Sequence, residues 1–124
     1  MGLIYKQILV KGNKGERTLH VLMDTGASHT LIRGDIAHEL ATPAPLARTI
    51  SAQFASGSGE VKDMVSLSLL IDGQEVVTPA LVLENLSEEL LIGAEFFQRF
   101  KVVLDPEREE TRFTDPEALK VKII

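Results

Sequence analysis

The chain has 124 residues, a length that fits one compact domain over residues 1–124. It contains no cysteine, which excludes disulfides, thiolate catalysis and zinc–thiolate sites. The net charge is −5, from 13 basic and 18 acidic residues with no Lys/Arg cluster, so we expect no nucleic-acid partner.

The sequence also carries no sign of secretion or of a membrane span. Residues 1–6 lack the basic region and the apolar stretch of a signal peptide. No apolar run approaches the ~20 residues that a membrane-spanning helix needs. We therefore expect a soluble, cytoplasmic protein with no membrane partner.

Short strands separated by turns are predicted along most of the chain. The strand-like segments, in chain order, are residues 4–10, 18–23, 30–33, 48–54, 61–71, 75–83, 90–92, 101–104 and 111–113, with a final apolar segment at 119–124. Turn signals lie at Gly12–Gly15 and at Asp72-Gly73. This pattern indicates a mostly β fold.

Two short helices and two loops complete the predicted elements. One helix is expected over residues 36–40 with Asp35 as its N-cap, and the other over 94–100 with an apolar side. Loops are expected at Thr42–Pro45 and at Ala55–Gly59, where the residues are small and flexible.

The motif with the clearest chemistry is Asp24-Thr25-Gly26-Ala27-Ser28, which directly follows an apolar strand. Gly26 lets another segment or a substrate approach closely. The Thr25 hydroxyl can lock the loop, and Ser28 can hydrogen-bond a carboxylate oxygen and help to hold it ionised. The same tripeptide is also compatible with an ordinary turn, so the motif alone leaves both readings open.

Two further segments, in the same order and at a similar spacing, make the chain resemble the retropepsins, the single-lobe aspartic proteases of retroviruses and their cellular relatives. Residues 22–28 resemble the active-site loop of that family, residues 54–61 its glycine-rich flap, and Leu91-Ile92-Gly93 the segment that packs beside the loop. The resemblance covers roughly residues 4–114. It implies a closed, barrel-like single lobe with one or two short helices, in a two-fold dimer.

The resemblance assigns catalysis to Asp24 and support of the active-site loop to Thr25, Gly26, Ala27 and Ser28. It assigns substrate covering to a flap made of Ala55, Ser56, Gly57, Ser58 and Gly59. It also implies that the terminal segments, Leu3–Val10 and Leu119–Ile124, interleave with those of a partner. Apolar pockets are expected from Leu22, Ile32, Val82 and Ile92.

A single Asp-Thr-Gly means that one chain holds half of a carboxylate pair. We therefore expect a homodimeric endopeptidase in which two Asp24 carboxylates activate water against a peptide or protein substrate, with no metal and no other cofactor. The alternatives are a catalytically silent dimerisation or peptide-binding module and a domain cut from a polyprotein. The intact Asp24-Thr25-Gly26 favours the enzyme.

One departure from the retroviral pattern concerns the dimer. Ser28 and Ala94 stand where retroviral enzymes often place an Asp and an Arg that pair near the interface. Both charges are missing together, so neither is left unpaired.

His20, His29 and His38 have no metal-ligand spacing, so no metal site is expected.

Overall fold

A computed structural model describes residues 3–54, 57–121 and 123 of the chain. Its elements, in chain order, are β1 (Leu3–Lys11), β2 (Glu16–Asp24), β3 (Leu31–Arg33), α1 (Gly34–Leu40), β4 (Ala44–Phe54), β5 (Gly57–Ile71), β6 (Gln74–Leu83), β7 (Leu90–Ile92), α2 (Ala94–Phe100), β8 (Val102–Asp105), β9 (Glu110–Phe113) and the 3₁₀ helix η1 (Pro116–Leu119). The predicted mostly β fold is confirmed.

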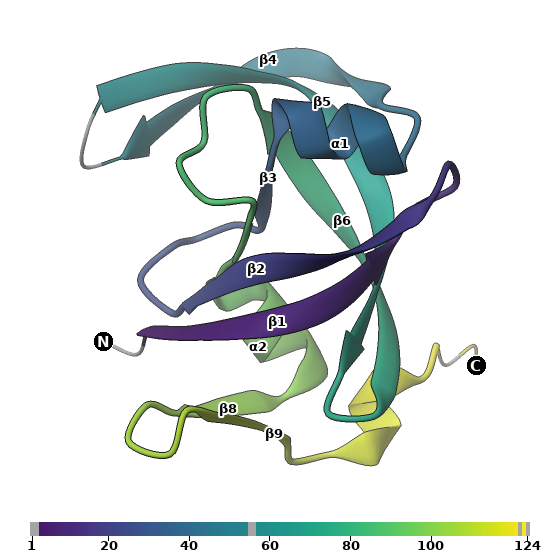
Figure 1. The fold of residues 1–124 in the computed structure, drawn as a ribbon, viewed down its shortest axis with the longest axis vertical. Coiled ribbons are helices and arrows are strands. Elements are labelled where there is room, and N and C mark those ends of the chain that lie inside the picture. The colour runs from purple at the N-terminus through teal and green to yellow at the C-terminus, as the bar shows by residue number, and fades with distance from the viewer. Residues whose placement is uncertain (1–2, 55–56, 122, 124) are drawn as a thin grey trace.

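The strands close into a barrel, because the first and the fifth strands pair. The sheet order is β1-β2-β7-β3-β6-β5-β4, and β1 also pairs with β5 from Leu9↔Leu70 to Lys11↔Ser68. β4 pairs only with β5, so the β4–β5 hairpin extends out of the barrel as an arm, as Figure 1 shows. β8 and β9 form a separate two-stranded sheet.

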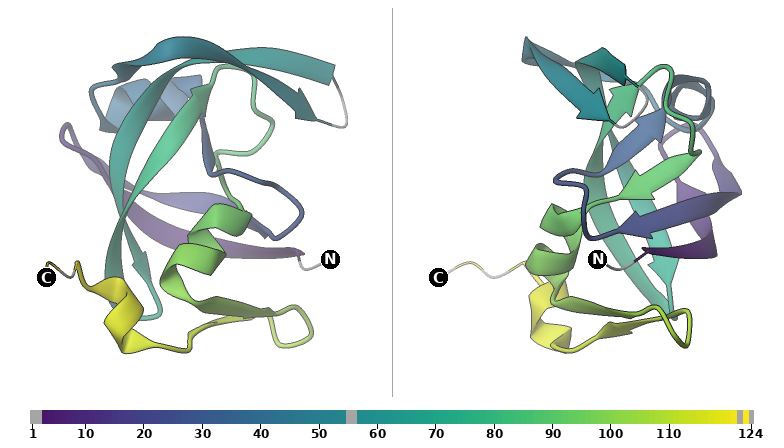
Figure 2. Two further views of the ribbon diagram at one scale, coloured as in Figure 1. Left: turned by 180° about the vertical axis from the view of Figure 1, so that it is seen from behind. Right: turned by 90° about the vertical axis from the view of Figure 1, so that its left-hand side faces the viewer.

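The hydrophobic core fills the barrel and extends to the buried faces of α1 and α2. Alternate residues of β5 point inward, with Val65, Leu67, Leu69 and Ile71 each at most 2% exposed. This is the alternation that the sequence predicts for a half-buried strand. The buried faces of both helices join the same cluster, and Figures 1 and 2 show α1 and α2 packed at different ends of the barrel. Each fully buried Leu, Ile or Phe side chain contributes roughly 1.5–3 kcal/mol to folding.

Turn chemistry sets the two hairpins of the barrel. Gly12 N donates to Gly15 O at 2.8 Å, which closes the β1–β2 turn. Asp72 and Gly73 both have positive φ, 49° and 79°, as the two-residue turn between β5 and β6 requires. Both predicted turns are therefore confirmed.

Several predicted boundaries are wrong. α1 begins at Gly34, and its N-cap is Arg33 rather than the predicted Asp35. Asp35 lies in the first turn, where its Oδ1 accepts from Ile36 N at 2.9 Å. β4 already begins at Ala44, inside the predicted 42–45 loop. The apolar segment predicted over 119–124 is not a strand in its described part. Leu119 is the last residue of η1, and Val121 and Ile123 lie outside any helix or strand, about nine-tenths exposed.

The helices of the described ranges are all too short or too polar to cross a membrane.

Candidate active site

Asp24 is the last residue of β2, a strand whose preceding residues Val21, Leu22 and Met23 are buried. The backbone turns sharply after it, because Ala27 N donates to Asp24 O at 3.2 Å. Gly26 N donates to the Asp24 carboxylate at Oδ1, at 2.8 Å. Asp24 is thus half-buried, and a backbone amide of its own loop orients its carboxylate.

The segment after β7 holds this loop from behind. Ala94 N donates to Ala27 O at 2.7 Å, and Glu95 N donates to Ser28 O at 3.4 Å. A side chain at Gly93 would put its Cβ 2.4 Å from the carbonyl oxygen of His29, so the two backbones meet where only glycine fits. The expected packing of Leu91-Ile92-Gly93 beside the loop is confirmed.

Thr30 closes the loop with three hydrogen bonds and is 1% exposed. Its N–H donates to Glu95 Oε1 at 2.5 Å, its Oγ1 accepts from Gly93 N at 3.3 Å, and its carbonyl accepts from Leu81 N at 3.0 Å. Glu95 Oε2 is buried without a hydrogen bond within the described ranges and lies 3.9 Å from Arg99 Nη2. Sequence reasoning missed Thr30 and Glu95. The available signal was their position: Thr30 lies two residues after the Asp24–Ser28 motif, and Glu95 lies two residues after Leu91-Ile92-Gly93.

Ser28 has a different partner from the one predicted. Its Oγ lies 2.8 Å from His29 Nδ1 and is not bonded to the Asp24 carboxylate. Thr25, Gly26 and Ser28 are all exposed on the loop, and Ala27 is half-buried. The loop therefore presents polar groups outward, while its inner side is tied to Gly93-Ala94-Glu95.

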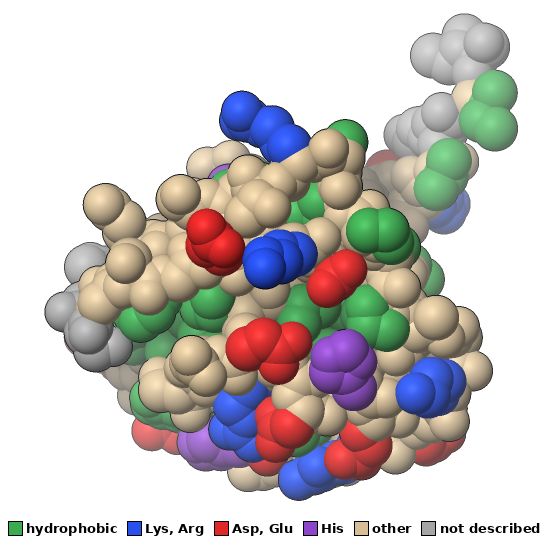
Figure 3. All heavy atoms as spheres, turned by 90° about the horizontal axis from the view of Figure 1, so that it is seen from above, with side chains coloured by type: hydrophobic (Ala, Val, Ile, Leu, Met, Phe, Trp, Pro, Cys, Tyr) green, Lys and Arg blue, Asp and Glu red, His purple; other side chains and the backbone are tan. Residues whose placement is uncertain are grey.

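A groove of about 620 Å³ opens beside Asp24. Its floor is an apolar strip of Leu31, Leu81 and Leu91, which the strand register places side by side on β3, β6 and β7. The arm supplies the opposite wall with Ile50 to Phe54 of β4. Figure 3 looks down on this end of the molecule, where hydrophobic side chains lie beside the arm and charges of both signs are interspersed elsewhere.

The predicted pocket residues Ile32, Val82 and Ile92 are wrong by one position. They are 0%, 4% and 0% exposed and face the barrel core, so their strand neighbours line the groove. Successive residues of a strand face opposite sides, so a shift of one residue exchanges core for groove. Leu22 is likewise buried and does not line the groove.

The predicted flap coincides with the end of the arm. Ala55 and Ser56 lie outside the described residues. Gly57, Ser58 and Gly59 are not a loop, because they belong to β5 and pair with Phe54, Gln53 and Ala52 of β4. Gly57 has a φ of 153°, a backbone conformation that side chains disfavour. The arm points toward the side of the barrel that carries the 25–30 loop (Figure 1).

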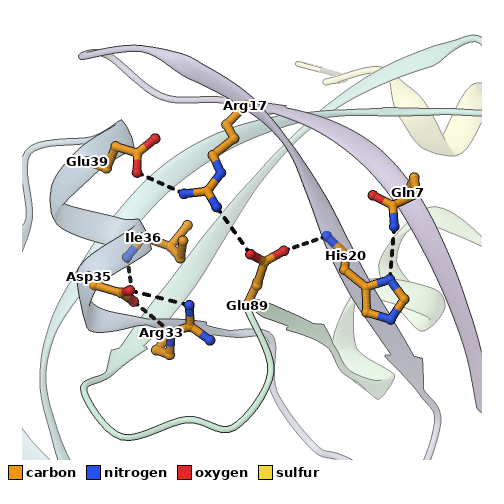
Figure 4. A network of polar contacts seen from close by, with 8 residues as sticks. All are labelled: Gln7, Arg17, His20, Arg33, Asp35, Ile36, Glu39 and Glu89. Carbon is orange, nitrogen blue, oxygen red and sulfur yellow. Dashed lines mark hydrogen bonds and ion pairs between the residues drawn. The ribbon is translucent and has the colours of Figure 1, made fainter.

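A surface network braces the segment that leads into β7 (Figure 4). Glu89 Oε1 accepts from His20 N at 2.7 Å, and Arg17 reaches both Glu89, at 3.4 Å, and Glu39, at 2.9 Å. In the same view Asp35 is bonded by the Arg33 guanidinium, which lowers the pKa of its carboxyl. The network thus ties β7, and through it Gly93, to β2 and α1.

The three histidines lie on different elements: His20 on β2, His29 on the loop and His38 on α1. Among residues 3–54, 57–121 and 123, no group of three or more His, Cys, Asp or Glu side chains is arranged to hold a metal ion.

Comparison with known proteins agrees with this geometry. The model of a family described as "gag-polyprotein putative aspartyl protease" matches residues 10–99, and the chain belongs to this family. The match contains both the Asp24 loop and Gly93. No curated protein matches the chain by sequence.

Solved structures share the retropepsin-like fold. The retroviral protease-like domain of Ddi1 from Leishmania major is 14% identical, with a TM-score of 0.66 over 93% of this chain and 90% of that one. EIAV protease, solved with the inhibitor HBY-793, is 19% identical, with a TM-score of 0.57 over 82% and 90%. A Legionella pneumophila protein of unknown function is 15% identical, with a TM-score of 0.50 over 86% and 95%. The predicted closed, retropepsin-like lobe with two short helices is therefore confirmed.

Proposed function

We propose that the chain is an aspartic endopeptidase that hydrolyses peptide bonds as a homodimer. The observation that carries this proposal is the oriented Asp24 carboxylate at the edge of a large apolar groove. The groove suits an extended peptide, because its floor is a strip of leucines and its wall is a strand of the arm. Membership of an aspartyl protease family supports the same chemistry.

The chemistry needs a second carboxylate, which a second copy would supply. Two carboxylates about 3 Å apart do not both ionise, so one acts as a base toward water and the other as an acid toward the carbonyl oxygen. A two-fold axis beside the loop would place each Asp24 opposite its own copy. The two roles are then equivalent until an asymmetric peptide binds, and the pKa values belong to the pair.

The side of the barrel that carries the 25–30 loop suits such a contact. Figure 1 places the start of β1, the 25–30 loop and the turn between β8 and β9 on this side, and the arm extends toward it. Within the described residues, Leu3–Ile8 pair only with β2, so this half of β1 has a free edge. Leu3 is 51% and Tyr5 49% exposed on it.

The C-terminal segment is a weaker candidate for the shared sheet than the sequence indicates. η1 lies toward the opposite side of the molecule from the start of β1 in Figures 1 and 2. We therefore assign the interface to the Asp24 loop and the free half of β1. The Ser28 and Ala94 positions leave this interface without the charge pair that retroviral enzymes often have.

In the proposed cycle the arm is the flap. It would close over a bound peptide, pair with its backbone and exclude bulk water from the carboxylates. The arm already forms one wall of the groove, since Ile50, Ala52 and Phe54 line it together with Leu31 and Leu91.

The test is Asp24→Asn in a peptide-library digest at mildly acidic and neutral pH. We expect loss of cleavage by at least about 10³-fold with the fold retained, because the change removes one acid or base and relieves like-charge repulsion between the two copies. Asp63→Asn is the matched control, since Asp63 lies on β5 outside the groove lining. Equal activity of wild type and Asp24→Asn would contradict the proposal. Peptide binding without cleavage by the wild type would favour the silent binding module.

A further inference from the structure

The groove contains a second ionisable side chain that the proposed catalysis does not use. Of the 15 described residues that line it, only Asp24 and His29 are ionisable, and the other 13 are apolar or neutral. His29 is exposed, so its ring is accessible to whatever occupies the groove.

The position of His29 is fixed by its backbone and by one neighbour. Its N, C and O atoms lie so close to Gly93 that a Cβ there would come within 2.8 Å of all three. Ser28 Oγ lies 2.8 Å from Nδ1 of the ring. Within the described ranges, Nε2 makes no hydrogen bond, and it is the nitrogen left for a ligand.

The groups around His29 are acidic or neutral, so any attraction for an anionic ligand comes from His29 itself. From β2 the groove presents the Asp24 carboxylate, which the proposed function assigns to the reacting water. From α2, Glu95 is engaged with Thr30 N and with Arg99. The arm contributes the neutral side chains of Ser51 and Gln53. His29 is thus the one side chain among the lining residues that can carry a positive charge.

We propose that His29 selects substrates that carry Asp or Glu beside the scissile bond, an inference that rests on the proposed endopeptidase function. A protonated imidazole donates from both nitrogens. Ser28 Oγ accepts from Nδ1–H, and Nε2–H is free to donate to a carboxylate of the substrate in a charge-assisted hydrogen bond. The second donated hydrogen bond requires the charged imidazole, so the preference belongs to the protonated form of His29 and is absent from the neutral form.

Symmetry sharpens the inference. A two-fold dimer contributes two His29 side chains, one from each copy. An extended peptide then meets one on each side of the scissile bond. The acidic preference therefore occurs at two positions that are equally far from the cleaved bond, one toward each end of the peptide.

The test compares matched peptides that differ only by Glu against Gln, scanned through each position around a cleavage site found in the library digest. The measured quantity is the ratio of the two kcat/KM values at about pH 5 and at pH 8, because the ratio cancels the pH dependence of the Asp24 pair. We expect Glu to be favoured about tenfold at pH 5 at the two symmetric positions, with the ratio approaching 1 at pH 8.

His29→Gln should reduce the ratio at pH 5 to about 1, and His29→Asp should favour Lys over Glu. His38→Gln is the matched control, since His38 lies on α1 outside the groove, and it should leave the ratio unchanged. Cleavage with no acidic preference in the wild type, or a preference that survives both His29 changes, overturns the selection by His29 and leaves the protease intact. Absence of any cleavage overturns both proposals.

Discussion

The Asp24 loop and the β4–β5 arm face each other across the groove, but different kinds of contact hold them. The loop is tied through Ala27, Ser28 and Thr30 to the backbone and side chains of residues 93–95. The arm is mostly exposed and is held by the pairing of its own two strands and by the packing of Val61 and Ala52 against Leu83 and Leu86. The contrast indicates that the Asp24 loop is tied closely to the barrel, while the wall opposite is held by fewer contacts.

Substitutions of Gly93 beside the loop and of Gly57 in the arm test this difference between the two regions. Gly93 should give the largest effect. In Gly93→Ala the new Cβ would meet backbone atoms of His29, which cannot rotate away. We expect a loss of about 3 kcal/mol or more in the free energy of unfolding, measured by urea denaturation, with activity lost in parallel. Gly15→Ala, where nothing lies within 4 Å of the new Cβ, should change stability by less than about 0.5 kcal/mol. Equal effects at the two glycines would show that the loop is not held by this close approach.

Gly57→Val tests the arm and should give an intermediate effect. Its φ of 153° disfavours a β-branched residue, yet the nearest atom to its new Cβ is Phe54 Cε2 at 3.9 Å. We expect kcat/KM to fall about tenfold while the free energy of unfolding changes by less than about 1 kcal/mol.

The matched control for the arm is Gly73→Val, at the β5–β6 turn with a φ of 79°. There the strain falls within the paired barrel, so we expect stability to fall and the kcat/KM of the folded fraction to be retained. Unchanged kinetics for Gly57→Val would remove the arm from the catalytic cycle.

The smallest effect is expected away from both regions, at the pair of half-buried Arg33 and exposed Asp35. The Arg33 hydrogen bond lowers the pKa of Asp35 in the folded chain, so the pair stabilises the fold above the unfolded pKa of about 3.9 and this contribution is lost as the pH falls through the folded pKa. Arg33→Gln should therefore lower Tm by at most about 2 °C at pH 7 and by nothing measurable near pH 2. A Tm difference that grows toward low pH would contradict this sign.

Much of the fold can be predicted from local sequence signals, because these favour the same strands and turns that the barrel requires. The alternation of Leu67, Leu69 and Ile71 predicts a half-buried strand, and Asp72-Gly73 supplies the positive φ values of its turn. The Asp24 motif predicts a tight loop directly after an apolar strand. The inward face of β3 and β7 is not predictable, because consecutive apolar residues, two in β3 and three in β7, do not indicate which of them faces the core.

Long-range partners are the other part that sequence reasoning could not supply. Thr30 and Glu95 are 65 residues apart, and only the closed barrel brings the amide of one to the carboxylate of the other. Ser28 lies next to His29 in the sequence, yet its rotamer decides between the Asp24 carboxylate and the imidazole ring, and it points to the ring. Such choices depend on packing rather than on residue type.

The proposed pair of Asp24 carboxylates from two copies is tested most directly by mixing two versions of the chain. Wild type at a fixed concentration is combined with a ninefold excess of Asp24→Asn, and peptide cleavage is measured per wild-type chain, with sedimentation confirming dimers. If chains pair at random and both Asp24 carboxylates are needed, about one wild-type chain in ten finds a wild-type partner, so the activity should fall to about one tenth. Activity that does not change with the excess would contradict a site built from two copies of Asp24.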